Sequence, residues 1–390
     1  MYKKSIMKRL LIVTITAVTL CLSCQHLEFV PGENSEDTEE TRKPLEITPN
    51  SLQIAYNEGF YGIYTSEEQW GECTVLSPNT VRIDQVNYIR KLTNEEKNQI
   101  GDSISFRIEL YAAYDEWDRN ANSWYFKVPK GTTITSKEDL EGIGKFPLII
   151  YTTPYFHHEN EFNHITYERN ISAYAQDLRD PESDIYIQYE VESNPQKFFS
   201  DTIPYCDQPG FRADIFIDTK DKGTIPNTVT NVYVPLISRN LEEGEEVFST
   251  SFKLGEDIED AYIWYTSSGH GSKEEARTRQ HLVSIDDKEV ANFDSKIACT
   301  PYEYYDEINP WGRKCPGCTW RYPTRNWCQG GEIEPRILKL GSLAKGTHTF
   351  TLDTKQMNDE GVNKGINTVT PIAGYLSTNA VIIGRKKSTK

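Results

Sequence analysis

The chain has 390 residues, a formal net charge of −16 at pH 7 and 12% aromatic residues. Its length allows two domains of ordinary size, and an acidic chain without a basic patch is a poor partner for nucleic acid. The aromatic residues, which include 23 Tyr, suit either a sheet-rich core or a surface that binds carbohydrate, and composition leaves both open.

Residues 1–24 have the pattern of an export signal. Four basic residues precede an apolar run, Leu10 to Leu22, that is too short to span a bilayer as a finished helix. The run ends at Ser23-Cys24-Gln25, which resembles a bacterial lipoprotein signal with lipid on Cys24; an ordinary cleaved signal peptide is the alternative. Residues 25–46 are acidic without an apolar period and predict a flexible tether. We therefore expect an exported lipoprotein, in the periplasm or at the cell surface, that meets the membrane only through the lipid on Cys24.

Alternating apolar and polar residues predict strands from about residue 47 onward. Pro, Gly, Asn and Asp separate these segments, and a short helix is expected only at Asn94 to Ile100. Because no long segment has the helical period, we expect an all-β chain of antiparallel sandwiches. The strands predicted in the first half are 81–83, 104–110, 124–128, 146–151, 185–191 and 213–218.

The best internal boundary is the polar segment 221–226, which contains Gly and Pro. A new strand is predicted directly after it, and short strands then continue without an internal sequence repeat. We therefore expect an N-terminal domain over residues 47–224 and a C-terminal domain over residues 225–390. The strands predicted in the second half are 232–237, 248–254, 261–266, 281–285, 336–340, 347–352 and 380–384.

A charged segment follows the strand at 104–110 and reads Tyr114-Asp115-Glu116-Trp117-Asp118-Arg119-Asn120-Ala121-Asn122. One interpretation is a solvated turn in which Arg119 neutralises its acidic neighbours. The other is an acid that Arg119 holds ionised and Trp117 covers, ready to bind a sugar or to activate water. The spacing alone leaves both open.

Further polar groups stand beside other predicted strands. Glu190 lies on the polar face of its strand together with Gln188 and Glu192. In the C-terminal half, a Gly-containing loop with His270 precedes Glu274-Glu275. The segment Pro323-Thr324-Arg325-Asn326-Trp327-Cys328 follows later in the chain.

Six cysteines lie beyond the signal segment and, in an exported chain, favour structural disulfides. Cys315-Pro-Gly-Cys318 could instead be a redox pair, although no βαβ pattern surrounds it. Together with Cys299 and Cys328 it could form a four-cysteine zinc site. The seven His have no metal-ligand spacing, and His164 is expected in a polar loop, so we expect neither a metal nor a cofactor.

These blocks, in this order, resemble the peptide-N-glycosidase F family, whose members hydrolyse the bond between an N-glycan and its asparagine. The resemblance covers roughly residues 80–390 in scattered blocks. It implies two antiparallel eight-stranded jelly-roll β-sandwiches packed side by side, with the site at their interface. The expected partners are N-glycosylated peptides and proteins, and the chain is expected to be a monomer. A Cys299–Cys328 bridge is implied too, which would leave Cys315 to pair with Cys318 and Cys73 with Cys206.

The resemblance also implies roles for single residues. Asp118 would be catalytic, contacting the first GlcNAc and orienting or activating water, while Arg325 would hold it ionised. Glu275 would position the water or the asparagine, with Glu274 as the alternative, and Glu190 would bind the chitobiose. The substrate-binding candidates are Arg119, Arg325, Trp117, Trp327, His270 and Glu192, with core packing as the alternative for the two Trp.

Two departures from the family pattern bear on these roles. Lys273 and Arg277 stand where relatives carry a pair of Cys, and Glu192 stands where relatives often carry Trp. We expect the narrower Glu192 side chain to turn toward solvent and to leave room for a core-decorated chitobiose, such as one with 3-linked fucose.

The residue types favour direct attack by water on the amide, because no Ser-His-Asp order or reactive-Cys context is evident. Two other function classes stay open. One is a glycoside hydrolase with paired carboxylates, and the other is a non-catalytic carbohydrate-binding lipoprotein.

Overall fold

The structure is a computed structural model and describes residues 50–63, 66–156, 163–195, 202–221, 230–242, 244–271, 274, 278–299, 324–355, 357–358 and 374–387. The predicted signal and tether lie outside these residues, as do Glu275, Cys315 and Cys318. Across these ranges no helix is long and apolar enough to cross a membrane.

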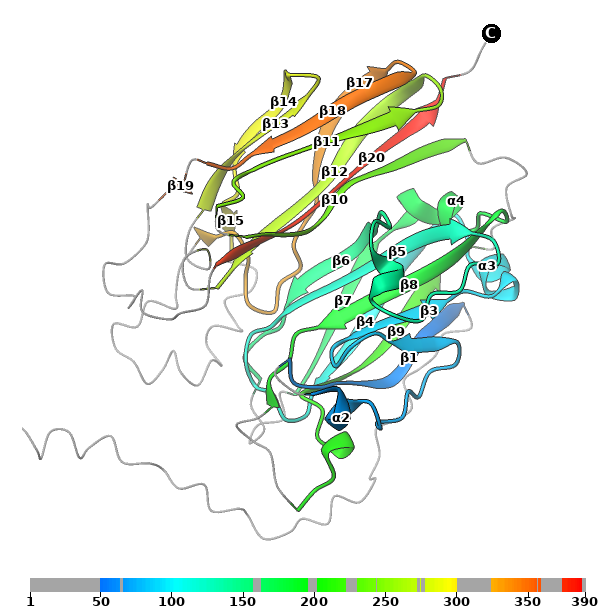
Figure 1. The fold of residues 1–390 in the computed structure, drawn as a ribbon, viewed down its shortest axis with the longest axis vertical. Helices are drawn as coiled ribbons and strands as arrows, with labels where there is room; N and C mark the ends of the chain where they lie inside the picture. The colour runs from blue at the N-terminus through cyan, green and yellow to red at the C-terminus, as the bar shows by residue number, and fades with distance from the viewer. Residues whose placement is uncertain are drawn as a thin grey trace, which may run out of the picture. The chain divides into compact units, whose positions relative to one another are not determined.

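The N-terminal half of the described chain folds into two antiparallel sheets that face each other (Figure 1). Its helices are short, and α3 (Asn94–Gln99) confirms the predicted one; the others are α2 (Glu67–Trp70) and α4 (Ala175–Leu178). One sheet has the order β1 (Ser51–Phe60), β9 (Phe211–Thr219), β4 (Ile104–Ala112) and β7 (His164–Asn170). The other has the order β2 (Thr80–Arg82), β3 (Asn87–Lys91), β8 (Ser183–Val191), β5 (Asn120–Pro129) and β6 (Phe146–Thr152).

The C-terminal half forms a second antiparallel sandwich (Figure 1). One sheet has the order β10 (Asn231–Glu242), β20 (Tyr375–Lys386), β12 (Ile258–His270) and β17 (Arg336–Leu343). The other has the order β11 (Val247–Leu254), β18 (Gly346–Asp353), β13 (Thr278–Ile285) and β14 (Lys288–Asp294), and β19 (Met357–Asn358) also pairs with β13. Two short strands, β15 (Ile297–Ala298) and β16 (Thr324–Arg325), pair with each other.

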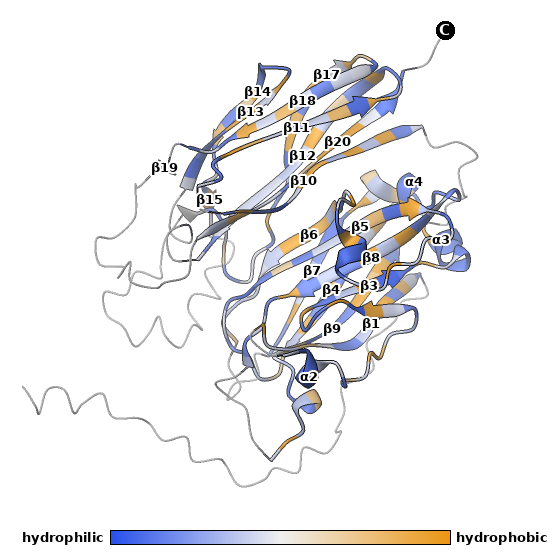
Figure 2. Cartoon of the chain, in the orientation of Figure 1, coloured by the Kyte–Doolittle hydropathy of each residue, from blue (hydrophilic) through white to orange (hydrophobic). Residues whose placement is uncertain are grey.

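Alternation along the strands puts apolar side chains inside each sandwich. Figure 2 shows apolar and polar segments following one another along these strands. In β5, Ala121 and Tyr125 belong to the N-terminal core, whereas Trp124 reaches the C-terminal sandwich. Burial of each large apolar side chain stabilises the folded state by about 1.5–3 kcal/mol. The alternating pattern therefore stabilises both cores.

The N-terminal core continues onto one face of the C-terminal sandwich. Trp264 of β12 belongs to the same buried cluster as the N-terminal core. Hydrogen bonds of 2.8 Å cross this boundary; for example, Trp124 Nε1 donates to Asn379 Oδ1, and Tyr233 Oη donates to the carbonyl of Ala173. The side-by-side packing of two sandwiches is thereby confirmed.

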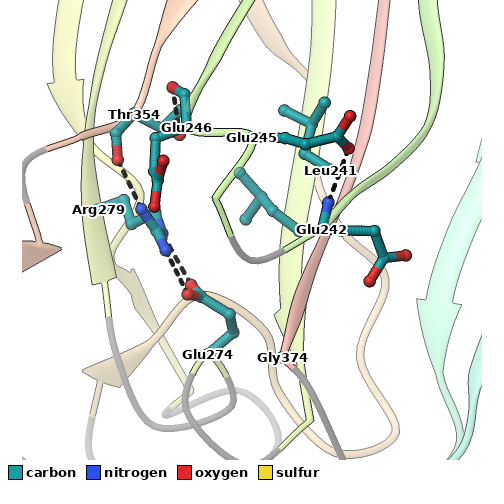
Figure 3. Close-up of a pocket in the computed structure, with 9 residues that line it drawn as sticks. Leu241, Glu242, Glu245, Glu246, Glu274, Arg279, Thr354 and Gly374 are labelled. Carbon is teal, nitrogen blue, oxygen red and sulfur yellow. Dashed lines mark hydrogen bonds and ion pairs between the residues drawn. The ribbon is translucent and has the colours of Figure 1, made fainter.

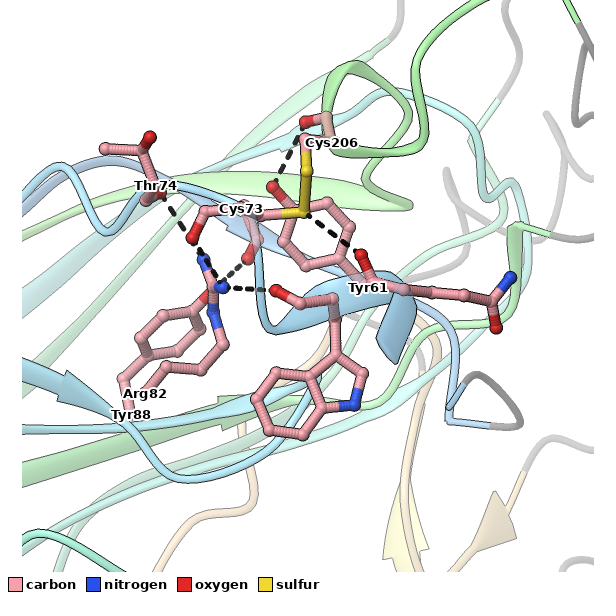
Figure 4. Close-up of a disulfide and its surroundings, with 9 residues drawn as sticks. Tyr61, Cys73, Thr74, Arg82, Tyr88 and Cys206 are labelled. Carbon is pink, nitrogen blue, oxygen red and sulfur yellow. Dashed lines mark hydrogen bonds between the residues drawn. A yellow bond between two sulfur atoms is a disulfide. The ribbon is translucent and has the colours of Figure 1, made fainter. Parts of the chain in front are cut away.

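Two disulfides hold loops of this fold. Cys299 is bonded to Cys328, and Cys73 is bonded to Cys206 (Figure 4). Both pairings were predicted and are confirmed. A four-cysteine zinc site is wrong, because the Cys299–Cys328 bridge takes two of the four thiolates that it needs.

Arg82 lies next to the Cys73–Cys206 bridge and holds the backbone around Cys73 (Figure 4). Its Nη1 donates to the carbonyls of Trp70 and Cys73 at 2.7 and 2.8 Å. Tyr61 Oη donates to the carbonyl of Cys206 at 3.1 Å. The bridge therefore fixes the segment around α2 against the segment that follows β8.

The sequence-based expectation for His164 is wrong. His164 was expected in a polar loop, but it is the first residue of β7. Its Nε2 lies 2.9 Å from Glu109 Oε2 of the neighbouring β4. The exposed face of β7 is entirely polar, and a strand on the sheet edge needs only one apolar face.

Candidate functional site

Asp115 is the anchor of the charged segment between β4 and β5. Its side chain is fully buried, and its Oδ1 accepts the Trp117 backbone N–H at 3.0 Å. Arg119 donates to both carboxylate oxygens, with Nε 2.7 Å from Oδ2 and Nη2 3.1 Å from Oδ1. The Asn194 backbone N–H donates to Oδ2 at 2.6 Å. The solvated-turn interpretation is therefore wrong, and the acid that Arg119 pairs with is Asp115.

The close approach of a second segment shapes this anchor. The carbonyl of Gly210 accepts the backbone N–H of Asp115 at 3.1 Å. A Cβ at position 210 would lie 3.0 Å from Asp115 Cβ and 1.8 Å from Ser193 Oγ. Only glycine fits here, because any larger residue would push the two segments apart.

Asp118 lies in the turn that Asp115 holds. It is half-buried, and Thr153 fixes the turn around it. Thr153 Oγ1 donates to the carbonyl of Trp117 at 2.9 Å and accepts the backbone N–H of Arg119 at 2.7 Å. The Trp117 ring packs against Tyr155, with the ring centroids 5.8 Å apart. The backbone on both sides of Asp118 is thus fixed while its carboxylate stays partly accessible.

The Arg119 guanidinium is close to several carboxylates. Burial lowers the pKa of Arg119, but the charge of Asp115 and its hydrogen bond oppose burial, and the net shift of this pKa is upward. Asp118 and Glu192 raise this pKa further through their charges. The two acids predicted for the site are therefore near the same cation.

The carboxyl group of Glu190 has a pKa near neutral. Its carboxylate accepts Asn122 Nδ2 at 2.8 Å from the paired residue of β5. Burial raises the pKa of Glu190 to about 7, although the hydrogen bond from Asn122 and the charge of Lys145 oppose the shift. The charge of Glu192 raises it further. A carboxyl group with this pKa can exchange a proton during catalysis at neutral pH.

Glu192 is held rather than free to turn toward solvent. Tyr375 Oη of β20 donates to Glu192 Oε1 at 2.8 Å. Burial raises the pKa of Glu192, although the hydrogen bond from Tyr375 and the charge of Arg119 oppose the shift. The expectation of a solvent-directed side chain at position 192 is therefore wrong. Tolerance of a core-decorated chitobiose stays a prediction.

Aromatic rings of the C-terminal sandwich stand beside Tyr375. The His270 ring packs against Trp327 and Tyr375, at centroid distances of 5.7 and 5.5 Å. His270 Nε2 lies 2.8 Å from Ser268 Oγ, and burial lowers the pKa of His270 to about 3, so the ring is neutral. Trp327 is only 2% exposed and packs with Ile150. Direct substrate contacts of His270 and Trp327 stay predictions.

Glu274 is bound inside the C-terminal sandwich. Arg279 donates to it from Nε at 2.8 Å and also from Nη2, while Arg279 Nη1 donates to the carbonyl of Thr354 at 2.8 Å (Figure 3). Both partners are buried. Glu242 and Glu246 line the same small pocket. Glu274 is therefore the partner of a buried cation.

Two further predicted contacts lie outside what the structure describes. Glu275 is outside the described residues, and only the backbone of Arg325 is described, paired with Ile297. The predicted Asp118–Arg325 pair thus stays a prediction. Among the residues that are described, no group of His, Cys, Asp and Glu is arranged to hold a metal ion.

A match to a protein family covers most of the C-terminal sandwich. Residues 240–376 match the family model described as peptide-N-glycosidase F, C terminal. The C-terminal sandwich therefore matches the C-terminal domain of the peptide-N-glycosidase F family. No curated protein matches the chain.

Solved structures confirm the all-β jelly-roll fold that the resemblance implied. The structure of PNGF-II aligns with a TM-score of 0.62 at 15% identity, over 87% of this chain and 66% of PNGF-II, so this chain spans just under two thirds of that protein. A peptide-N(4)-(N-acetyl-β-D-glucosaminyl)asparagine amidase aligns with a TM-score of 0.53 at 16% identity, over 87% and 97%. PNGase F from Flavobacterium meningosepticum, a glycosylasparaginase, aligns with a TM-score of 0.50 at 16% identity, over 87% and 96%.

Some residues at the candidate site were not found from the sequence. Asn122 was within the charged segment, and its spacing two residues after Asn120 could have placed both on one face of β5. Lys145, which lies 5.3 Å from the Trp124 ring centroid and influences Glu190, carried no local signal. Tyr375 carried none either, because its contact with Glu192 joins residues 183 positions apart.

Glu274→Gln should lower the free energy of unfolding by about 3–5 kcal/mol, because it leaves the buried Arg279 without its ionised partner. Urea denaturation measures the change. Glu242→Gln is the matched control, since Glu242 is exposed at the rim of the same pocket and should change stability by less than about 0.5 kcal/mol. A stable Glu274→Gln variant that has lost cleavage would move the second-domain catalytic glutamate from position 275 to 274.

Glu190→Gln should stabilise the protein at alkaline pH but not at acidic pH. The pKa of Glu190 is about 7 in the folded state and about 4.3 in an unfolded chain, so folding takes up a proton between these values. The protonated side chain contributes its full stability below about pH 4.3, and this contribution is lost as pH rises toward about 7. Gln imitates the protonated form and is insensitive to pH. Melting temperatures at the two pH extremes, with the exposed Glu289→Gln as control, measure the effect; an equal change at both would contradict it.

Proposed function

We propose that the protein is a glycan amidase that hydrolyses the amide bond between the core GlcNAc of an N-glycan and its asparagine. The observation that carries this proposal is the meeting of Glu192 with Tyr375. It brings the acids around Asp118 to the domain that matches the peptide-N-glycosidase F family. The fold is that of an asparagine amidase acting on N-acetylglucosaminyl asparagine, which supports the same substrate class.

The proposed reaction adds water to the asparagine side chain. Asp118 orients the water and takes its proton as the water oxygen bonds to the carbonyl carbon. Arg119, fixed by Asp115, contributes positive charge where the carbonyl oxygen becomes negative. The C–N bond then breaks as the nitrogen takes the proton that Asp118 removed from the water, giving Asp and a glycosylamine. Glu190 binds the chitobiose, and its pKa of about 7 lets it hold or release a proton there.

Glu275 and Arg325 complete this proposal through the family resemblance. Glu275 positions the water or the asparagine, and Arg325 keeps Asp118 ionised. Trp117, Trp327 and His270 contribute binding surface.

Mass spectrometry of a treated N-glycopeptide tests the function. In water enriched in heavy oxygen, an amidase converts Asn to Asp with one heavy oxygen in the side chain and releases the intact glycan. A glycoside hydrolase leaves GlcNAc on Asn, and a binding protein changes nothing. Either of the last two results would overturn the proposal.

We also propose that the chain acts outside the cytoplasm, anchored by a lipid on Cys24, on N-glycosylated peptides and proteins. The signal-like residues 1–24 and the two disulfides support export. Cys24→Ser should release the protein from the membrane fraction and abolish incorporation of labelled palmitate. Unchanged labelling would contradict lipid attachment at Cys24.

A further inference from the structure

Glu192 and Tyr375 form a single hydrogen-bonded unit across the two sandwiches. Glu192 follows β8, and its backbone N–H donates to the carbonyl of Asn120 at 3.0 Å. Its Oε1 accepts Tyr375 Oη at 2.8 Å. Glu192 remains partly exposed, and its side-chain hydrogen bond to the described residues is made through Oε1 rather than Oε2. One carboxylate oxygen is thus held while the other is available to a ligand.

The C-terminal sandwich fixes the Tyr375 side chain. Tyr375 is the first residue of β20 and pairs with His270 of β12, whose ring lies 5.5 Å away. The residue before it, Gly374, is in close contact with Glu274: a Cβ there would lie 2.8 Å from Glu274 Cγ. Because strand pairing, ring packing and this contact all restrict it, the hydroxyl of Tyr375 has little freedom to move.

The charges around Glu192 decide what this bond does. The charge of Arg119 lowers the pKa of Glu192, and the charge of Glu192 raises the pKa of Glu190. Tyr375 of β20 is the residue of the C-terminal sandwich that faces Glu192. Tyr375 keeps its proton, because burial and the charge of Glu192 raise its pKa well above 10. It can therefore only donate to the carboxylate, and this aims the remaining oxygen as an acceptor for sugar hydroxyls.

Resting on the proposed amidase function, we propose that Tyr375 is a positioning residue that holds the Glu192 carboxylate at the core-sugar position, where its Oε2 accepts a hydrogen bond from a sugar hydroxyl. The ligand class is the chitobiose core of an N-glycan. Since this hydrogen bond exists both in the bound substrate and in the transition state, the unit strengthens binding and leaves the chemical step unchanged.

Tyr375→Phe tests this role, because it removes one oxygen and keeps the ring against His270. We expect KM for a defined N-glycopeptide to rise roughly 10-fold to 100-fold, the loss expected for one hydrogen bond to a charged group, while kcat changes less than about 2-fold. Binding of free chitobiose, measured by calorimetry, should weaken by the same factor. In a Glu192→Gln background, the same Tyr375→Phe change should have a much smaller effect, because the two residues act as a unit.

Tyr233→Phe is the matched control. Tyr233 Oη also donates a 2.8 Å hydrogen bond across the two sandwiches, to the carbonyl of Ala173, but it does not touch the site. We expect any loss of melting temperature to be similar in both variants and the rise in KM to occur only in Tyr375→Phe. Equal KM values in wild type and Tyr375→Phe would overturn the positioning role and reduce the bond to a domain contact.

The binding measurement separates this inference from the proposed function. Wild-type protein that binds chitobiose but cleaves no glycopeptide would refute the amidase alone, and weaker binding by Tyr375→Phe would still support the unit. Wild-type protein that cleaves the glycopeptide but binds no chitobiose would refute the positioning role alone, because Glu192 would then have no sugar to hold.

Discussion

Asp118→Asn should slow deglycosylation by about 100-fold to 10,000-fold with little change in stability. Asn keeps the shape of the side chain but cannot take a proton from water. The turn itself depends on Asp115 and Thr153, which this substitution leaves in place. Initial rates of glycan release from a labelled glycopeptide measure the activity, and urea denaturation measures the stability.

The control is Asp287→Asn, which makes the same chemical change at an exposed position whose left-handed backbone Asn accepts. It should leave both rate and stability unchanged. If Asp118→Asn keeps a rate within a few-fold of wild type, Asp118 is a structural residue and the catalytic acid must be sought elsewhere in the site.

Asp115→Asn should instead lower the free energy of unfolding. Its carboxylate is fully buried and accepts hydrogen bonds from Arg119 and from the backbone of Trp117 and Asn194. Asn offers one acceptor oxygen and leaves the guanidinium unpaired, so we expect a loss of about 3–5 kcal/mol. Activity should fall with it, because the turn that carries Asp118 loses its anchor.

Asp260→Asn gives the comparison for this second variant. Asp260 also pairs with an arginine, Arg385, but both side chains are exposed. The loss there should stay below about 1 kcal/mol, as for other surface ion pairs. A similarly small loss at Asp115 would mean that the buried pair is not essential to the fold.

Strand positions were predictable where one face is buried and the register is regular. Residues 104–110 and 185–191 alternate cleanly and appear as parts of β4 and β8. β1 was missed because its register shifts after Gln53 and again after Ala55, and because the buried Glu58 interrupts the apolar pattern. That glutamate accepts the backbone N–H groups of Leu76 and Ser77, a contact that no local pattern reveals.

The site was predictable only in its local part. The charged segment pointed to Asp118 and Arg119, but the choice of Asp115 as the partner of Arg119 depends on a backbone group 79 positions away. The burial of Glu190 could not be predicted from the sequence either. The alternation put Glu190 on a polar face, but the surrounding protein raises its pKa to about 7. Long-range contacts of this kind exist only after the sandwiches have packed.

The Cys73–Cys206 disulfide makes the candidate site depend on oxidation of the chain. It spans 133 positions, and closing a loop of this size removes several kcal/mol of chain entropy from the unfolded state, about 4–5 kcal/mol for roughly 100 residues. Cys206 is also close in sequence to Gly210, whose carbonyl accepts the backbone N–H of Asp115. A newly made chain in a reducing cytoplasm therefore lacks the disulfide near the segment that holds the turn with Asp118. If the proposed amidase function holds, we expect glycan release to appear only after the disulfide has formed outside that compartment, so that the cytoplasm of the producing cell contains no active protein; a fully reduced protein with undiminished activity would contradict this.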